Sequence, residues 1–458
     1  REMIEKGLVT AAHDISDGGL GVALAEMAIA GNIGAEITLE TSLPLHAALF
    51  AEDQACYVLT VKPDDVEMLR GFALVAVIVV GWVAFGWLEQ AANGATSISL
   101  DFRIFWAAAR LALLDAPLDA FDTARLAAMH GTSGEGWMPW AYPPAFMVAL
   151  MPLGGLHFAL ALAVFTALSA AAMLAAARPL AQGILPLWLA LALAPAYLPS
   201  FLMGQTAVLW TAGLMAALAC LASGRPVLAG VFIGLLTLKP QLGLLIPVAL
   251  IAGGHWRCIA SATLTALVLA LAATLVTGPG YWPLMVEMMQ VHFDIVRGTA
   301  AENARMISVY AALAGLGLSE PLALALQWSV TALAALAVAL AWASPRICAD
   351  LRAATLLIAI LLSQPYLWYY ESALLAPVAL FLIRARVLSL THLPGLLLLA
   401  VMWLGLGPAI LVQFLSGVEV SLRMVFAPIL LLTLAVTLRA LTLRALRGVP
   451  LHSNSPQG

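Results

Sequence analysis

Residues 71–106 read GFALVAVIVVGWVAFGWLEQAANGATSISLDFRIFW, an apolar run followed by a polar segment. Runs of about 20 apolar residues are long enough to cross the hydrocarbon core of a bilayer as helices. Such runs recur from here to residue 440, and 63% of the 458 residues are hydrophobic while 10% are charged. Soluble domains carry about 25% charged residues. The sequence therefore predicts an all-α polytopic membrane protein with about eleven to twelve transmembrane helices.

Two of the apolar runs contain interruptions that predict breaks in their helices. Residues 144–177 are too many for one span and contain Pro152, so we expect a short helix followed by a crossing helix. Because proline disrupts the interior of a helix, Lys239-Pro240 is expected to divide residues 226–252 into a hairpin of two short helices. The predicted spans are 71–88, 144–177, 181–199, 205–222, 226–252, 257–276, 321–343, 353–367, 369–383, 393–414 and 423–440.

The placement of arginines predicts the orientation in the membrane. If residue 70 is cytoplasmic and 226–252 turns back on itself, ten of the sixteen arginines after residue 70 fall on the cytoplasmic side. Positive charge favours that side. The prediction is a multi-pass protein of the plasma (inner) membrane with both termini in the cytoplasm. It has two long outer loops, 89–143 and 277–320, and a disordered cytoplasmic tail at 449–458.

The charge balance divides the chain into two parts. Residues 1–70 hold 12 acidic and 4 basic residues, whereas residues 71–458 hold 13 and 17. Such an asymmetry suggests segments of different origin. We therefore expect a cytoplasmic α/β fragment at 1–69, followed by a transmembrane domain at 70–448. The elements expected in the fragment are a Gly-rich turn at 12–20, a helix at 22–30, short strands at 37–39 and 56–61, and a helix from Pro63.

The string HDISDGGL at residues 13–20 carries a resemblance. Together with ALAEMA at 23–28 and EDQ at 52–54, it resembles the C-terminal part of phosphoribosylformylglycinamidine synthase, an enzyme of purine synthesis. The resemblance implies a phosphate-binding loop. A Gly-Gly turn at a helix start can present backbone N–H groups to a phosphate, although a plain turn has the same sequence. The resemblance covers a fragment of one domain without the ATP-binding half, so we expect no synthase activity.

Asp101 and Lys239 are the charged residues that stand out in the membrane part. Asp101 lies in an apolar stretch, where a carboxylate costs free energy unless it is paired or functional. Its neighbour Arg103 offers one such partner. Lys239 is the only lysine after residue 62. A lysine can extend its charge to the membrane interface, but the broken helix around Lys239 also favours the lining of a cavity, where an anionic group could bind.

Other polar residues fall on the predicted outer face. Gln205 opens a span there, and Arg305 lies in the second outer loop. Residues 363–371 form a short outer turn that contains Tyr369 and Glu371. Tyrosines at this position are typical of an interfacial aromatic belt. Glu371 is harder to explain in that way, because it begins a helix that must enter lipid.

Metal ions, cofactors and nucleic acid are not expected as partners. The cysteines, Cys56, Cys220, Cys258 and Cys348, stand singly, so the sequence suggests neither a zinc site nor a disulfide framework. Basic residues are dispersed along the predicted membrane edges instead of forming a basic patch.

Several short motifs, taken in order, resemble a family of membrane enzymes. They are Asp101 after the first span, Tyr142-Pro143-Pro144 before the second, Gly204-Gln205, Lys239-Pro240 and the Ser-x-Pro-x-x-x-Tyr turn at 363–369. This order resembles glycosyltransferase family 87 over residues 71–440. The resemblance implies a GT-C type helical bundle, a polyprenyl-phosphate-mannose donor, and a catalytic role for Asp101. Tyr369, Tyr370 and Glu371 depart from the family, since many relatives carry His in this turn.

The leading hypothesis is a metal-independent, inverting hexosyltransferase. It moves a hexose, mannose by the resemblance, from a polyprenyl phosphate to a lipid-linked or envelope glycan on the extracytoplasmic face. Asp101 is the expected base, and a fixed cation stabilises the leaving phosphate. The expected phosphate-binding residues are Lys239, Arg305 and Arg103, and the expected substrate-binding residues are Tyr142, Gln205, Tyr369 and Glu371. Two alternatives remain: a lipid or solute transporter without catalysis, and an inactive fusion carrying the synthase fragment.

Overall fold

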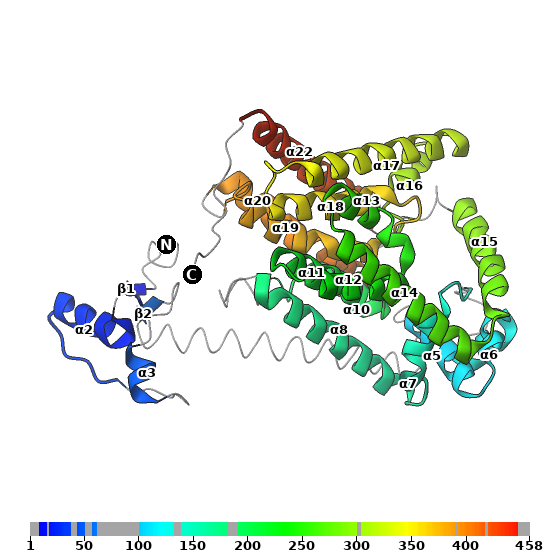
Figure 1. Ribbon diagram of the computed structural model, residues 1–458, viewed down its shortest axis with the longest axis horizontal. Coiled ribbons are helices and arrows are strands. Elements are labelled where there is room, and N and C mark those ends of the chain that lie inside the picture. Colours follow the sequence, from blue (N-terminus) through cyan, green and yellow to red (C-terminus); the bar gives the residue numbers. More distant parts are fainter. Residues whose placement is uncertain are drawn as a thin grey trace. The chain divides into compact units, whose positions relative to one another are not determined.

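The computed structural model describes residues 9–15, 18–37, 44–50, 57–61, 100–131, 139–180, 191, 193–299, 304–389, 392–416 and 420–447. The chain forms two compact units, residues 1–87 and residues 88–458 (Figure 1). The predicted first span, at 71–88, and the predicted tail, at 449–458, lie outside the described residues.

The first unit combines two strands with two helices in its described part. Strand β1 (Val9–Asp14) pairs antiparallel with β2 (Tyr57–Val61), and the helices are α2 (Gly19–Gly31) and α3 (Leu45–Phe50). The expected α/β character is therefore present. The predicted turn at 12–20 starts too early, because His13 and Asp14 pair with β2 as part of β1. Ile37, expected in a strand, lies in none.

The described part of the second unit consists of helices joined by turns and irregular segments, with an isolated bridge between Met306 and Trp368. The first helices are α5 (Leu100–Leu113), η1 (Pro117–Phe121), α6 (Thr123–His130), α7 (Pro144–Gly154), α8 (Phe158–Leu180), η2 (Pro195–Tyr197), α10 (Leu198–Met203), α11 (Ala207–Ala222), α12 (Pro226–Leu235), η3 (Leu236–Leu238), η4 (Pro240–Gly243) and α13 (Ile246–Ala252). They are followed by α14 (Trp256–Thr277), α15 (Tyr281–Thr299), α16 (Val309–Gly315), α17 (Glu320–Ala343), α18 (Ala349–Ser363), η5 (Tyr369–Leu374), α19 (Leu375–Arg384), α20 (Leu393–Leu404), α21 (Gly407–Ser416) and α22 (Leu422–Arg447).

Four of the described helices, α8, α14, α17 and α22, are long and apolar enough to cross a membrane. A fifth span is present if α20 and α21, which meet at a bend of 52°, are taken together. The predicted all-α membrane fold is confirmed. The count of spans among the described residues is lower than eleven to twelve, because the predicted span 71–88 and most of 181–199 lie outside them and several apolar runs fold into shorter helices. One such run is 144–177, which forms α7 and α8 as its Pro and Gly content predicts.

The predicted hairpin at Lys239-Pro240 is present. Helices α12 and α14 pack closely, since a Cβ atom added at Gly230 would lie 2.6 Å from the Ser261 Cβ, and one at Gly234 would lie 2.5 Å from the Thr265 Cβ. Gly230 faces Ser261 and Gly234 faces Thr265, so the residue numbers rise together along the contact and α12 and α14 run in the same direction. Because α13 connects them, the chain must reverse after α12, where η3 and η4 meet at Lys239.

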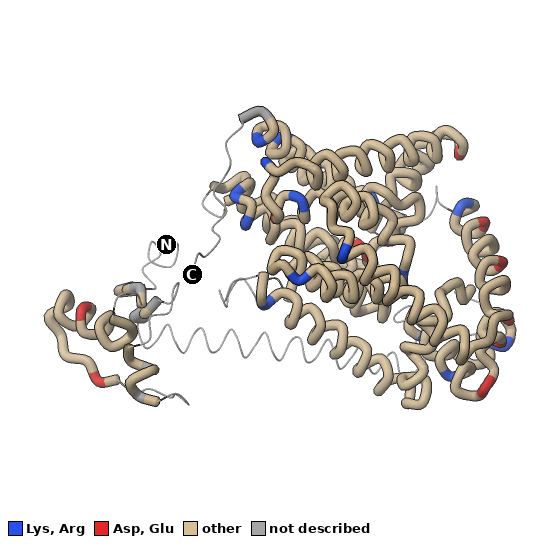
Figure 2. The backbone as a smooth tube through the Cα atoms, in the orientation of Figure 1, with Lys and Arg blue, Asp and Glu red and all other residues tan. Residues whose placement is uncertain are grey.

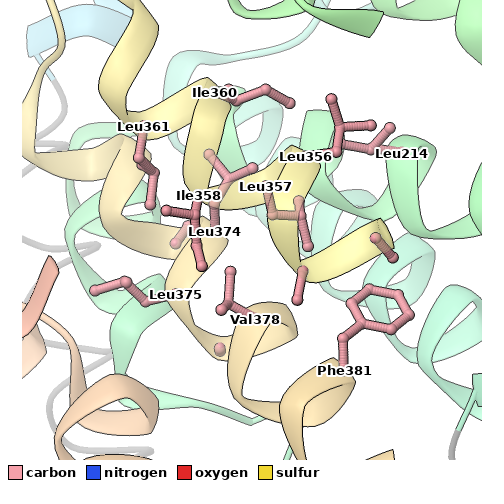
Figure 3. Packing of buried hydrophobic residues seen from close by; sticks show 14 of the residues in the cluster. Leu214, Leu356, Leu357, Ile358, Ile360, Leu361, Leu374, Leu375, Val378 and Phe381 are labelled. Carbon is pink, nitrogen blue, oxygen red and sulfur yellow. The ribbon is translucent and has the colours of Figure 1, made fainter. Parts of the chain in front are cut away.

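Helix α18 forms the centre of the second unit. Every residue from Ala353 to Ser363 is buried, as expected for a helix that is apolar on all sides. Figure 3 shows its leucines and isoleucines packed against Leu374, Val378 and Phe381, with Leu214 of α11 alongside. The turn between α18 and α19 is therefore anchored at both ends in the core, and η5 is buried along its whole length.

Charged residues are distributed unevenly over the second unit. Lys and Arg gather mainly at the end where α8 finishes and α11 passes into α12, whereas Asp and Glu gather at the end with α6 and α15 (Figure 2). This separation agrees with the predicted orientation, in which basic residues face the cytoplasm.

Candidate active site

Asp101 lies in the first turn of α5 and is 6% exposed. Its Oδ2 accepts a hydrogen bond of 2.8 Å from Nε2 of Gln205, in the turn between α10 and α11. The backbone of Gln205 is fixed by Ser200: the Gln205 N–H donates to the Ser200 carbonyl, and the Ser200 hydroxyl donates to the Gln205 carbonyl, each at 2.8 Å. The orientation of the Asp101 carboxylate is therefore set by a turn more than one hundred residues away in sequence.

Gly204 allows this turn to approach α5. Its φ of +65° lies in the left-handed region, which favours glycine. A Cβ atom at this position would also lie 2.4 Å from the Cβ of Phe102, next to Asp101. A side chain here would push the turn away from α5, so the Gly204-Gln205 pair is a local requirement for the contact with Asp101.

Lys239 and Glu371 form a buried ion pair. The Lys239 Nζ lies 2.8 Å from Oε1 of Glu371, and the two side chains are 4% and 3% exposed. The other carboxylate oxygen of Glu371 accepts the Trp368 N–H at 2.6 Å. An ammonium group carries three N–H donors, and Glu371 is the partner that the structure shows for Nζ among the described residues. Lys239 thus keeps N–H donors for a further anion.

The charges of this region act on Asp101. Burial raises the pKa of Asp101 from 3.8 to about 6. The hydrogen bond from Gln205 and the positive charges of Lys239 and Arg305 lower that pKa, and the negative charge of Glu371 raises it. A carboxyl group with a pKa near 6 is ionised at neutral pH and still basic enough to accept a proton.

Arg305 is brought to the site by a short backbone pairing. The N–H of Tyr369 donates to the Arg305 carbonyl at 3.1 Å, and the Ile307 N–H donates to the Leu367 carbonyl at 2.9 Å. The second outer loop is thereby joined to the turn before η5. Arg305 itself is exposed, while Tyr369 is buried.

Tyr142 lies beside Gln205 and close to Asp101. Burial, followed by the negative charge of Asp101, raises the pKa of Tyr142, and its side chain is within hydrogen-bonding reach of Gln205. Its ring centroid lies 5.1 Å from that of Phe105, and its carbonyl accepts the hydroxyl of Tyr281 at 3.0 Å. The predicted substrate residues Tyr142 and Gln205 are thus neighbours of Asp101.

The Arg103 side chain packs against Phe158 and does not join the charged groups around Asp101. Residues two apart on a helix do not share a face, and the guanidinium carbon of Arg103 lies 4.5 Å from the centroid of the Phe158 ring. Arg103 is not among the charges that shift the pKa of Asp101. The structure therefore separates Arg103 from the predicted phosphate-binding group.

A groove with a cavity of about 580 Å³ runs between α8, α11 and α12. Helix α11 extends along it for about 24 Å at 1.5 Å per residue. Thr206, Lys239 and Phe146 line the end near Asp101, and Arg225 lines the other end. The walls between are apolar, with Ala172, Ala176, Leu209, Ala216, Phe232 and Leu235 among them.

The sequence reasoning above did not find Thr206 or the groove. A possible signal was the repeated alanine at spacings of three and four on α8 and α11, which leaves one side of each helix without large side chains. No group of three or more His, Cys, Asp or Glu side chains that could hold a metal ion occurs in the part of the chain that the structure describes.

Residues 140–365 match the model of glycosyltransferase family 87. The membrane unit resembles glycosyltransferase family 87. This match confirms the resemblance predicted from the motifs and supports a membrane glycosyltransferase. Four predicted site residues lie within the match: Tyr142, Gln205, Lys239 and Arg305. Asp101 precedes the matched region and Glu371 follows it, so their roles in a family 87 reaction depend on the geometry described above.

Residues 1–88 match the AIR synthase related protein, C-terminal domain. Phosphoribosylformylglycinamidine synthase subunit PurL is 53% identical over 75 residues in Bartonella quintana (16% of this chain, 10% of that protein). The same subunit of Rhodopseudomonas palustris is 61% identical over 67 residues, which are 14% of this chain and 9% of that protein. The chain thus spans about a tenth of the length of these curated relatives. The predicted resemblance is confirmed, and it continues past residue 69. No solved structure matches the chain.

Proposed function

We propose that the membrane unit transfers a hexose, with mannose as the first candidate, from a polyprenyl-phosphate donor to a lipid-linked or envelope glycan. The reaction takes place on the extracytoplasmic face of the plasma membrane, with both termini in the cytoplasm. One observation carries the proposal: the buried ammonium of Lys239 lies at the head of an apolar groove, and its charge acts on the buried carboxylate of Asp101, which is held by Gln205.

In the proposed reaction, Asp101 takes the proton of an acceptor hydroxyl, whose oxygen attacks the anomeric carbon of the donor sugar. The bond from this carbon to the phosphate oxygen breaks, and the lipid phosphate leaves with an additional negative charge. Lys239 and Arg305 stabilise that charge. A single displacement of this kind inverts the anomeric configuration. The positive charge comes from the side chains, so this scheme uses no metal ion.

The remaining site residues position the two substrates. Gln205 and Tyr142 lie next to Asp101, and in this proposal they bind the acceptor. Tyr369 and Glu371 belong to the turn that differs from many relatives. In this proposal Tyr369 faces the sugar, and Glu371 holds Lys239 in place through the ion pair.

The rate of transfer should depend on pH with a midpoint near 6, the pKa of Asp101. A base acts in its deprotonated form, so the rate should fall about tenfold per unit as the pH drops below 6 and stay level above it. The hydrogen bond from Gln205 lowers this pKa, so Gln205→Leu should move the midpoint upward. Initial rates between pH 4.5 and 8 measure both. If Gln205→Leu leaves the midpoint of the pH profile unchanged, the group that titrates near pH 6 is not Asp101.

A bulky side chain in the groove should interfere with long donors only. Ala216 lines the groove, and Ala216→Phe should raise the KM for a donor of ten or more isoprene units by about tenfold, which corresponds to about 1.4 kcal/mol. The KM for a donor with two isoprene units should not change. Leu271→Phe is a matched control, because Leu271 is 64% exposed on α14 and does not line the groove. An equal rise in KM for both donors would mean that the lipid chain of the donor does not bind in the groove.

A lipid transporter is the second candidate, because an apolar groove could also guide a lipid through the protein. It predicts movement of the labelled lipid across a vesicle without any new glycosidic bond, and no dependence on Asp101. The inactive fusion predicts neither movement nor transfer. For residues 1–88 we propose no synthase activity, since they correspond to about a tenth of the curated synthases.

Labelled sugar transfer tests the proposal. Membranes containing the protein are incubated with a polyprenyl phosphate carrying radiolabelled mannose, and in parallel with other labelled hexoses. Label should enter a glycan or glycolipid for one of these donors. If the inserted protein leaves every donor unchanged, the proposed reaction is wrong.

A further inference from the structure

Thr206 has a buried hydroxyl without a partner. The residue is 6% exposed, and its Oγ1 makes no hydrogen bond to any described residue. Thr206 is the N-cap of α11, where a threonine hydroxyl usually accepts a backbone N–H of the first turn. It does not do so here. A polar group in such surroundings is normally satisfied, so Thr206 requires an explanation.

Other buried threonines of the second unit form a hydrogen bond that Thr206 lacks. Their hydroxyls donate to the carbonyl four residues earlier: Thr211, Thr277, Thr331, Thr355, Thr433 and Thr437. The equivalent acceptor of Thr206 would belong to Leu202. The turn at Gly204 and Gln205 separates α10 from α11, so the helical geometry needed for that bond is missing. The hydroxyl is left for something that is not part of the described chain.

A buried cation lies at the same place. Lys239 lines the same end of the groove as Thr206, and its ammonium group has three N–H donors. The ion pair with Oε1 of Glu371 occupies one side of this ammonium group and leaves its other N–H groups for a further anion. The N-terminus of α11, a helix of 16 residues, adds a partial positive charge there. A hydroxyl donor, an ammonium and a helix N-terminus together favour a phosphate.

We propose that Thr206 donates its hydroxyl hydrogen bond to the phosphate of the lipid donor, beside Lys239, at the head of the groove between α8, α11 and α12. This inference rests on the proposed function. Gln205 and Thr206 are adjacent, and the Thr206 N–H donates to Oε1 of Gln205 at 3.3 Å, while Nε2 of Gln205 holds Asp101. One dipeptide therefore connects the base that activates the acceptor with the group that holds the donor.

The test measures binding of polyprenyl phosphate, the product lipid, to the purified full chain in nanodiscs. Thr206→Val should raise the Kd about tenfold, the factor expected for one lost hydrogen bond to a charged group. Thr206→Ser keeps a hydroxyl and should bind as the wild type does. Thr211→Val is the matched control, since its hydroxyl already bonds the Ala207 carbonyl at 2.7 Å. Binding of polyprenol, which has no phosphate, should be the same for all four proteins.

Thermal unfolding separates binding from a structural role. Valine replaces an unsatisfied hydroxyl with a methyl group of similar size, so the melting temperature of Thr206→Val should not fall. In transfer assays the same variant should raise the KM for the donor without moving the midpoint of the pH profile. A structural role predicts a lower melting temperature and an equal loss of polyprenol binding.

Three results would overturn the inference. The first is a Thr206→Val variant that binds polyprenyl phosphate as tightly as the wild type. If the wild type also transfers sugar, only the role of Thr206 is wrong and the proposed function stands. The second is displacement of the lipid by millimolar inorganic phosphate alone, which would assign the site to free phosphate. The third is a wild type that binds neither polyprenyl phosphate nor polyprenol, which removes the lipid donor and the proposed function together.

Discussion

Asp101→Asn is expected to lower the rate of sugar transfer by about 100- to 10,000-fold, the range that general bases contribute. Asparagine keeps the size of the side chain and an oxygen that can accept the hydrogen bond of Gln205. It cannot take a proton from an acceptor hydroxyl. The variant should therefore fold and bind the donor like the wild type, and lose only the chemical step. Initial rates, donor binding and thermal unfolding measured on the same preparation separate these effects.

Asp119→Asn is the control for this experiment. Asp119 belongs to the same predicted outer loop, but it is paired with the exposed Arg125. Its replacement should leave the rate of transfer within about twofold, because surface ion pairs contribute little. If Asp101→Asn transfers sugar as fast as Asp119→Asn, Asp101 is not the base.

The second large effect concerns the ion pair of Lys239 and Glu371. Removing one partner leaves the other charge buried and unpaired, which costs about 3–5 kcal/mol. Lys239→Met and Glu371→Gln should therefore each lower the melting temperature clearly. The double variant buries neither charge, and its glutamine can still accept the Trp368 N–H, so it should regain most of the lost stability.

Transfer should not recover with stability. The double variant lacks the ammonium that stabilises the leaving phosphate, so its rate should stay at least about 100-fold below that of the wild type. Melting curves and initial rates of the two single variants, the double variant and the wild type complete the cycle. A double variant with near wild-type transfer would reduce Lys239 to a structural role. A double variant as unstable as the single ones would mean that the two residues do not act as a pair.

The membrane class and the local breaks follow from residue patterns. Long apolar runs predict membrane helices, and the proline after Lys239 predicts the hairpin that the parallel packing of α12 and α14 requires. The bounds of single spans are predicted less well, because hydropathy does not report where a helix ends. The predicted span 353–367 is an example, since α18 ends at Ser363 and an irregular turn follows.

The partners within the site could not be predicted in the same way. The Lys239–Glu371 pair and the Asp101–Gln205 hydrogen bond join segments far apart in sequence, and neither periodicity nor composition reports such contacts. Arg103 shows the opposite error: it is close to Asp101 in sequence, but the helix turns it toward Phe158. Thr206 resembles an ordinary N-cap in the sequence, and only the missing hydrogen bond distinguishes it.

The stereochemistry of the product tests the central claim most directly. The purified protein in proteoliposomes is given a polyprenyl-phosphate hexose of known anomeric configuration, and the anomeric proton coupling of the sugar in the product is measured by NMR. A single displacement with Asp101 as base predicts a new glycosidic bond of the opposite configuration. A product that retains the configuration of the donor would contradict the account, and so would labelled lipid that crosses the vesicle membrane with its sugar still attached to the phosphate.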